Sequence, residues 1–580
     1  MGLAIYFNTL AASFHYDDMT AIVYSDVVKN LGDWRLIGNS FNTRFLLGLS
    51  LAFNYAIGRL DVTGYHLFNI FVHILSSALV YFLVTMTFKS PAMRESSLAD
   101  RADVIGLFSS LLFLVHPVQT QAVTYIWQRS ASLATFFYLC SLVFYAKVRL
   151  TGRVFYYAAA FAATVLGMFT KEITATIPIL MGIYEFYFFN DRKEEFKKRF
   201  LILSPFLATL SIIPLMLMRS SRITFGLMRP EAHKDITRWV SEEVMPRHDY
   251  YLTQLNVIRT YLRLLFFPAN QNLDYDYPIS HRLTDPGVVL SVLLLGGLFL
   301  LAVVVFKKQR LISFGILWFF IALSVESFVV QKDVIFEHRL YLPMTGFAIG
   351  VAAALGLLLT RRRNFILALF IISAFFLIAA YRRNLIWKDE ATLWEDVIKK
   401  SPNKATGYNF AALAYSDKRD FDRAITYYQK AVQIKPDFDA AYTNLGTAYA
   451  ARGRHEEAIQ AYRKAVEIDA NTPSAISAYN NLGIEDSSLG QYEEAADSFK
   501  KAAEIAAKID PKMVEPLNNL GMLYDALGRH EDAIELFKKA IAINPNYQKA
   551  YRQLVEAYKS AGKIQEAEEL TNKIKRITRA

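Results

Sequence analysis

The chain has 580 residues, of which 53% are hydrophobic, 14% aromatic and only 20% charged, and its mean hydropathy is +0.21. This composition excludes an ordinary soluble protein and a disordered one, and it indicates a chain that lies partly in lipid. The single cysteine, Cys140, excludes an intramolecular disulfide framework and a zinc site built from several thiolates. The net charge of +11 is typical of basic cytoplasmic loops in a membrane protein, so we expect no nucleic acid partner.

Residues 1–384 are predicted to form a polytopic helical membrane domain. Apolar segments of spanning length begin near Tyr65, Val104, Ala131, Val154, Glu172, Arg199, Gly287, Leu311, Tyr341 and Asn364. Residues 1–14 carry no basic start of a signal peptide and are interpreted as the outer part of a first membrane helix, which gives about eleven spans. Residues 261–267 are apolar but too short to span, so we expect an interfacial or re-entrant piece in a long outer loop over residues 219–286.

Loops rich in Lys and Arg follow alternate segments. They lie at residues 89–101, 147–153, 192–199, 307–310 and 361–363. The positive-inside rule predicts that these loops are cytoplasmic. The other loops, and the C-terminal domain if the number of spans is odd, then face the opposite side of the membrane.

Clusters of polar and ionisable residues next to the membrane all fall on this outer side. They are Tyr16-Asp17-Asp18, His116-Pro117 with Gln128-Arg129, Lys171-Glu172, residues 272–278 (NLDYDYP), and Lys332-Asp333 with Glu337-His338-Arg339. Such groups are costly near lipid, so their convergence predicts a cavity for a charged ligand, although single residues of this kind can also snorkel or pair.

The chemistry of these residues narrows the function. The sequence contains no Gly-rich phosphate loop, G-x-S-x-G elbow or H-E-x-x-H helix, so nucleotide hydrolysis and zinc proteolysis are poorly supported. A carboxylate that accepts a proton, with cations that hold a phosphate, suits sugar transfer from a lipid phosphate. Proton-coupled transporters also place acids and bases at this depth.

Residues 405–580 are predicted to form an α-solenoid of tetratricopeptide repeats (TPRs) over about 405–438, 439–472, 476–509, 514–547 and 548–580. The second repeat carries Leu445, Gly446 and Tyr449 at marker positions, and small markers allow paired helices to pack closely. Residues 385–404 are interpreted as a connecting or capping helix. An asparagine recurs on the first helix of three successive repeats, at Asn444, Asn481 and Asn519. Its side-chain amide could hold a peptide backbone, although Asn-Leu-Gly is also a common sequence in such repeats.

The chain as a whole resembles the transmembrane and tetratricopeptide-repeat O-mannosyltransferases and their bacterial relatives, which are polytopic glycosyltransferases of the GT-C class. The resemblance rests on residues 14–22 (FHYDDMTAI), 51–73, 116–123 (HPVQTQAV), 170–172, 272–278 and 337–346 (EHRLYLPMTG), followed by the repeats. Several long motifs in this order are more specific than any one of them.

The resemblance implies transfer of mannose or another hexose from a polyprenyl-phosphate donor to a protein Ser or Thr hydroxyl, with inversion at C1. Asp17 is then the base, with Asp18 beside it, whereas the residues alone also fit a helix N-cap. Donor phosphate binding is assigned to Arg339, His338, Lys171, Arg129 and Lys332. The rest of the cavity is assigned to Glu172, Glu337, His116 and Arg44, although His116 is also typical of a histidine packed and hydrogen-bonded among helices. The repeats would bind the acceptor polypeptide, and no metal or further cofactor is expected.

Two features depart from the family pattern. The first helix is short, so the chain as given is expected to begin inside it, and Gln121 stands where an acid is expected. Two other functions stay open: a GT-C transferase acting on a cell-surface glycan or lipid, and a non-catalytic assembly factor whose membrane domain anchors the repeats. The compact loops favour a bacterial inner membrane, with the active site and the repeats on the periplasmic side.

Overall fold

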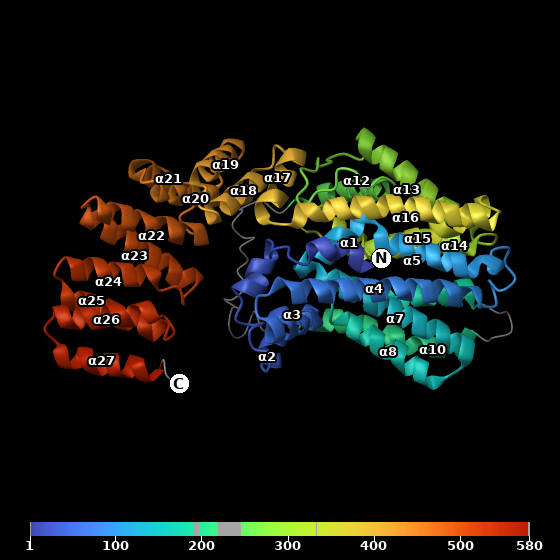
Figure 1. The fold of residues 1–580 in the computed structure, drawn as a ribbon, viewed down its shortest axis with the longest axis horizontal. Helices are drawn as coiled ribbons and strands as arrows, with labels where there is room; N and C mark the ends of the chain where they lie inside the picture. Colours follow the sequence, from blue (N-terminus) through green and yellow to red (C-terminus); the bar gives the residue numbers. More distant parts are fainter. Residues whose placement is uncertain (1, 190–195, 219–244, 332, 578–580) are drawn as a thin grey trace. The chain divides into compact units, whose positions relative to one another are not determined.

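A computed structural model describes residues 2–189, 196–218, 245–331 and 333–577. All regular elements within these ranges are helices, which confirms the predicted all-α fold (Figure 1). The described chain divides into a first compact unit that ends at Pro402 and a second that begins at Asn403.

The ten internal apolar segments each form a helix in the first unit. These helices are α4 (Val62–Phe88), α5 (Ala102–Val115), α7 (Arg129–Thr151), α8 (Val154–Met168), α9 (Ile177–Phe188), α10 (Phe196–Ala208), α13 (Pro286–Val305), α14 (Arg310–Phe328), α15 (Pro343–Leu358) and α16 (Arg362–Asn384). Among the described residues, six helical stretches are long and apolar enough to cross a bilayer, and a seventh is counted if the bent pair Ala99–Val115 and Pro117–Thr124 is one span. The chain is therefore an integral membrane protein, and the number of eleven spans stays a prediction.

The segment at residues 261–267 belongs to a longer element than expected. It overlaps the end of α12 (Arg247–Phe266), a helix of 20 residues that does not qualify as a span. Tyr250, Val257, Tyr261 and Leu264 are buried at helical spacing, so α12 packs one apolar face on the membrane core and leaves its other face polar. A pattern search limited to continuous apolar runs misses this kind of helix.

Several of the predicted cytoplasmic loops meet at one end of the first unit. The guanidinium of Arg101 donates to the carbonyl oxygens of Gly356 at 2.8 Å and Leu359 at 3.1 Å, at the end of α15. Arg362 pairs with Asp103 at 2.9 Å, and Arg310 donates to the carbonyl oxygen of Tyr187. These contacts agree with the predicted alternation of the loops; the side of the membrane that this end faces stays a prediction.

The second unit contains five helix pairs, which confirms the predicted TPR solenoid. They are α18 (Ala405–Asp417) with α19 (Phe421–Ile434), α20 (Asp439–Ala451) with α21 (His455–Ile468), α22 (Pro473–Ser488) with α23 (Tyr492–Ile509), α24 (Glu515–Ala526) with α25 (His530–Ile543), and α26 (Gln548–Ser560) with α27 (Ile564–Ile577) (Figure 1). A Cβ atom on Gly446 would lie 2.6 Å from the Tyr462 ring, so this marker glycine is needed for close packing of the pair.

Candidate functional site

The two predicted acidic residues lie in a loop between the short helices Phe7–Thr9 and Met19–Val23, outside the long apolar helices. Asp18 is fully buried, and its carboxylate accepts hydrogen bonds from the backbone N–H of His15 at 3.0 Å and of Trp127 at 2.7 Å. It makes no side-chain capping bond to the helix that follows. The N-cap interpretation therefore does not describe Asp18, which instead fixes the path of its own loop.

Asp17 has a different environment, because it is only half-buried. Its Oδ2 accepts a hydrogen bond of 2.6 Å from the Tyr125 hydroxyl, and the same hydroxyl oxygen accepts from the Asp17 N–H at 3.0 Å. Tyr125 thus fixes both the backbone and the carboxylate of this residue. A partly accessible and oriented carboxylate has the properties that a general base needs.

The charge state of Asp18 follows from its burial. Burial raises the pKa of this carboxyl to about 7, although the hydrogen bond from His15 and the nearby imidazole partly oppose the shift. Burial alone would lower the pKa of His15, but Glu390 and Asp18 outweigh it and raise that pKa. Because Asp18 is fully buried and both of its carboxylate oxygens accept backbone hydrogen bonds, the half-buried Asp17 is the better candidate of the pair.

A buried ion pair joins the loop before α9 to the last turn of α14. The Nζ of Lys171 lies 2.6 Å from Oε1 of Glu326, and both side chains are more than nine-tenths buried. Glu326 ends an apolar helix, α14, and we did not predict it as a site residue. The single acid within an apolar segment was the signal that could have identified it.

The neighbouring Glu172 carboxylate is also paired. It accepts from the Thr43 hydroxyl at 2.7 Å and lies 3.3 Å from a nitrogen of Arg44. Burial raises the pKa of Glu172, but Arg44 and Thr43 outweigh this effect and lower it to about 2. Arg44, which the sequence assigned to the cavity, therefore lies beside Lys171-Glu172.

We call Lys171, Arg44 and Arg339 the cation cluster. Arg339 and His338 belong to the E-H-R turn at Glu337–Leu340. The backbone N–H of His338 donates to Oε1 of Gln121 at 2.7 Å. The ring Nδ1 of His338 is buried and has no hydrogen-bond partner in the described part of the chain. Burial, with the charges of Lys171, Arg339 and Arg44, lowers its pKa well below the usual value. These effects favour the neutral imidazole of His338.

The other two residues of the E-H-R turn, Arg339 and Glu337, bond to neighbouring loops at residues 331–334 and 271–275 respectively. The Arg339 guanidinium donates to the carbonyl oxygens of Val334 and Asp333, both at 2.9 Å, and to the Gln331 side chain at 2.5 Å. Glu337 accepts from Gln271 and from the loop residues Asn272 and Tyr275, at 2.5–2.8 Å. Glu337 thus anchors the NLDYDYP loop next to His338 rather than facing an open cavity.

Two predicted site residues do not join this cluster, and a third is not described. Arg129 is fully buried and donates to Asn69 at 2.6 Å, Ser50 at 3.2 Å and the Tyr65 carbonyl oxygen at 3.0 Å, so it links helices. Both ring nitrogens of His116 contact the backbone, at Leu265 and Val118, as in a packed structural histidine. Lys332 lies outside the described residues.

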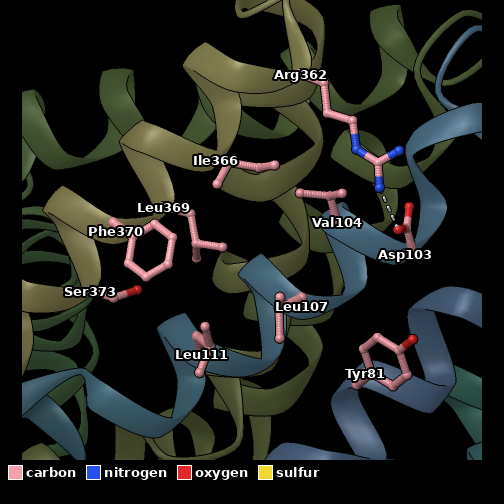
Figure 2. Close-up of a pocket in the computed structure, with 10 residues that line it drawn as sticks. All are labelled: Tyr81, Asp103, Val104, Leu107, Leu111, Arg362, Ile366, Leu369, Phe370 and Ser373. Carbon is pink, nitrogen blue, oxygen red and sulfur yellow. Dashed lines mark hydrogen bonds and ion pairs between the residues drawn. The ribbon is translucent and has the colours of Figure 1, made fainter.

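A cavity of about 450 Å³ lies elsewhere in the first unit (Figure 2). Side chains of α4, α5 and α16 line it, including Leu107, Ile366 and Phe370, and its charged members are the paired Asp103 and Arg362. It contains neither Asp17 nor the cation cluster and lies at the end of the basic loops. We therefore do not assign the site to this cavity. Within the described residues, no group of three or more His, Cys, Asp or Glu side chains is placed to hold a metal ion.

The three asparagines of the TPR array connect neighbouring repeats. In each bond the side-chain amide donates to a residue of another first helix: Asn444 to Asn409 at 3.2 Å, Asn481 to Thr447 at 3.3 Å, and Asn519 to Asn480 at 2.9 Å. The asparagines thus form a partly buried row along the first helices of the repeats. Peptide binding by this row stays a prediction.

Fold and site together define an integral membrane protein whose helical membrane domain precedes an array of tetratricopeptide repeats. Family models described as "Tetratricopeptide repeat" match residues 437–508 and 514–547, one described as "TPR repeat" matches 412–451, and one described as "PPR repeat" matches 549–577.

The comparisons confirm the resemblance to the transmembrane and tetratricopeptide-repeat O-mannosyltransferases. Protein O-mannosyl-transferase TMTC3 of Homo sapiens is 23% identical over 473 residues, which cover 74% of this chain and 50% of the relative. Tmtc3 of Drosophila melanogaster is 23% identical over 74% of this chain and 54% of the relative. TMTC2 of Mus musculus is 31% identical over 33% of this chain and 24% of the relative. The chain spans about half or less of the length of these relatives. A crystal structure of MamA protein is 28% identical over 29% of this chain and 88% of that chain, with a TM-score of 0.26.

Proposed function

We propose that this protein is a membrane glycosyltransferase of the GT-C class that transfers mannose or another hexose from a polyprenyl-phosphate donor to a Ser or Thr hydroxyl of a polypeptide. The site and the array would lie on the periplasmic face of a bacterial inner membrane. The names of the relatives support the reaction class, since they are protein O-mannosyl-transferases.

In this reaction the Asp17 carboxylate takes the proton of the acceptor hydroxyl as its oxygen attacks C1 of the sugar. The bond between C1 and the phosphate oxygen breaks, polyprenyl phosphate leaves, and the anomeric centre is inverted. The hydrogen bond from Tyr125 to Asp17 supports this role because it aims the carboxylate without removing its negative charge.

The leaving phosphate would be held chiefly by Lys171 and Arg44, whose ion pairs with Glu326 and Glu172 would exchange for phosphate oxygens and offset the developing charge. Arg339 would contribute from the same cluster if its bonds to residues 331–334 exchange for phosphate oxygens. No metal is required, because these side chains supply the positive charge.

One observation carries the proposal. Gln121 and Tyr125 lie four residues apart in one segment, and they contact His338 and Asp17 respectively. This segment therefore links the candidate base to the cation cluster at one end of the membrane domain. A transferase needs this arrangement, whereas a membrane anchor for a scaffold does not.

The test is to incubate the purified full chain with a panel of polyprenyl-phosphate hexoses and an acceptor polypeptide, and to measure released lipid phosphate. We expect consumption of one donor that depends on the acceptor, with inversion of the anomeric configuration in the product. If no sugar lipid is consumed under any condition, the protein is not this enzyme, and the scaffold function is favoured.

A further inference from the structure

The helix α17 (Glu390–Lys400) follows the membrane domain and contacts an outer loop at each of its ends. It belongs to the first unit, whereas residues 385–404 were interpreted as a cap of the repeats. Four residues, 401–404, separate α17 from α18 of the array. The contacts at its two ends concern the acidic loop and the NLDYDYP loop.

At its first residue, α17 holds the loop that carries Asp17. Oε1 of Glu390 accepts from the Tyr16 N–H at 3.0 Å and lies 3.4 Å from Nδ1 of His15. Oε2 accepts from Nε1 of Trp394 at 2.6 Å, so both carboxylate oxygens are engaged. Just before the helix, the Trp387 carbonyl oxygen lies 2.8 Å from the other ring nitrogen of His15.

The backbone conformation of Tyr16 depends on these contacts. Its φ is +46°, a left-handed conformation that a bulky residue rarely adopts unless its surroundings impose it. The bond from its N–H to Glu390 is one such constraint, and the next residue is Asp17. The direction of the candidate base therefore depends on α17.

At its other end, α17 holds the NLDYDYP loop. Nζ of Lys400 contacts the Gln271 carbonyl oxygen and Oδ2 of Asp396, both at 2.6 Å. The Ser401 hydroxyl accepts from Asn272 at 2.8 Å and from the Asp276 N–H at 2.9 Å. The same loop is bonded to Glu337, which precedes His338.

We propose that Glu390 and Lys400 are positioning residues that hold the acidic loop and the NLDYDYP loop in their working geometry from opposite ends of one helix. The inference rests on the proposed function for the meaning of that geometry. Neither residue touches the reacting atoms. Glu390 acts through the loop that carries Asp17, and Lys400 acts through the NLDYDYP loop, which is bonded to Glu337.

The test compares three variants of the full chain by hydrogen–deuterium exchange. In Glu390→Gln only one side-chain oxygen remains, so either the Tyr16 N–H or the Trp394 Nε1–H loses its acceptor, and the ion pair with His15 is also lost. We expect faster exchange at residues 14–18 and no change at 271–276, and the reverse in Lys400→Gln. Lys399→Gln is the matched control, since Lys399 is exposed on the same helix, and it should change neither segment.

The kinetic measurement uses polyprenyl-phosphate mannose as the donor. Glu390→Gln should lower kcat by about tenfold while leaving KM for the donor within about twofold, because misplacing a base affects the chemical step more than donor binding. Glu390→Asp should restore part of kcat, because it keeps the charge.

The two proposals fail in different ways. Unchanged exchange at both loops in Glu390→Gln and Lys400→Gln would overturn the positioning role, whether or not the protein is a transferase. Faster exchange with no donor consumed by the unmodified protein would instead contradict the proposed function and leave α17 as a device that holds the two loops.

Discussion

Adjacent aspartates in this protein have opposite environments. Asp18 is fully buried and bonded by two backbone N–H groups, whereas Asp17 is half-buried and oriented by the Tyr125 hydroxyl. The same chemical group therefore fixes the loop at Asp18 and is partly accessible to solvent at Asp17.

Replacing Asp17 by Asn should lower transfer by at least about a hundredfold, because a general base typically contributes a factor of 10²–10⁴. The midpoint of thermal unfolding should change little, since an amide still accepts from Tyr125. Asp26→Asn is the control, because Asp26 is exposed in the same region. Activity equal to that of the unmodified protein in Asp17→Asn would remove the assigned base.

The stability of the acidic loop should fall as pH rises from about 4 to about 7 through Asp18, and further above 6.5 through His15. The pKa of Asp18 is raised from 3.8 to about 7 in the folded protein, so its contribution is fully present below 3.8 and is lost through 7. The raised pKa of His15 acts in the same direction, with loss above 6.5. For Asp18 the change is at most about 4 kcal/mol.

The measurement is the midpoint of thermal unfolding of the detergent-solubilised protein across this pH range. Asp18→Asn cannot titrate, so its curve should be flatter than that of the unmodified protein. A midpoint that rises with pH, or an equal slope in both proteins, would contradict the assigned titration.

At the scale of helices, α14 and α15 pack in backbone contact at two glycines. A Cβ atom on Gly346 would lie 2.5 Å from the Gly315 carbonyl oxygen and 2.7 Å from Cβ of Trp318. Because α15 follows the E-H-R turn directly and Glu326, the partner of Lys171, lies near the end of α14, we expect this crossing to affect the spacing of Arg339 and Lys171.

Gly346→Ala should therefore destabilise the membrane domain by about 1–3 kcal/mol, as expected for overpacking against backbone. It should also lower transfer, because it separates the cations. Gly296→Ala is the matched control, since a Cβ atom there meets nothing within 4 Å. A comparison of unfolding midpoints tests this, and equal midpoints in the two variants would mean that the helices accommodate the added methyl group without cost.

At the scale of the whole chain, the proposed function gives the array and the membrane domain separate tasks. If the acceptor is a polypeptide held by the repeats, deletion of residues 405–580 should raise KM for a long polypeptide and leave transfer to a short peptide nearly unchanged. Equal transfer to both acceptors after deletion would favour a glycan or lipid acceptor. Replacing Asn444, Asn481 and Asn519 together by Ala should reproduce the effect if the row binds the peptide backbone.

The proposal also requires one arrangement across the membrane. The repeats and Asp17 should face the side opposite the basic loops. Protease added to sealed, right-side-out vesicles should therefore cleave the array but not residues 307–310. Protection of the array would place acceptor and base on different sides and would contradict the proposed function.

Particular residues mark how much of this could be predicted. The repeats were predictable because each TPR pair is a local unit with small and aromatic markers at fixed spacing, and Gly446 against Tyr462 is one such pair. Asp17, Lys171 and His338 stood out as polar residues beside apolar segments. Arg129 and His116 stood out for the same reason but prove to be satisfied by helices around them, since a sequence does not record hydrogen-bond partners.

The sequence by itself determined the helical segments of the membrane domain and the repeats of the C-terminal array. Hydropathy and repeat spacing are properties of short stretches of chain, so they can be read without the fold. Only the tertiary structure decided that α17 holds the loop of Asp17, that Glu326 pairs with Lys171, and that Asp18 is buried. Each of these depends on contacts between residues distant in the chain, and burial and pairing, not residue type, set whether a charged group can react.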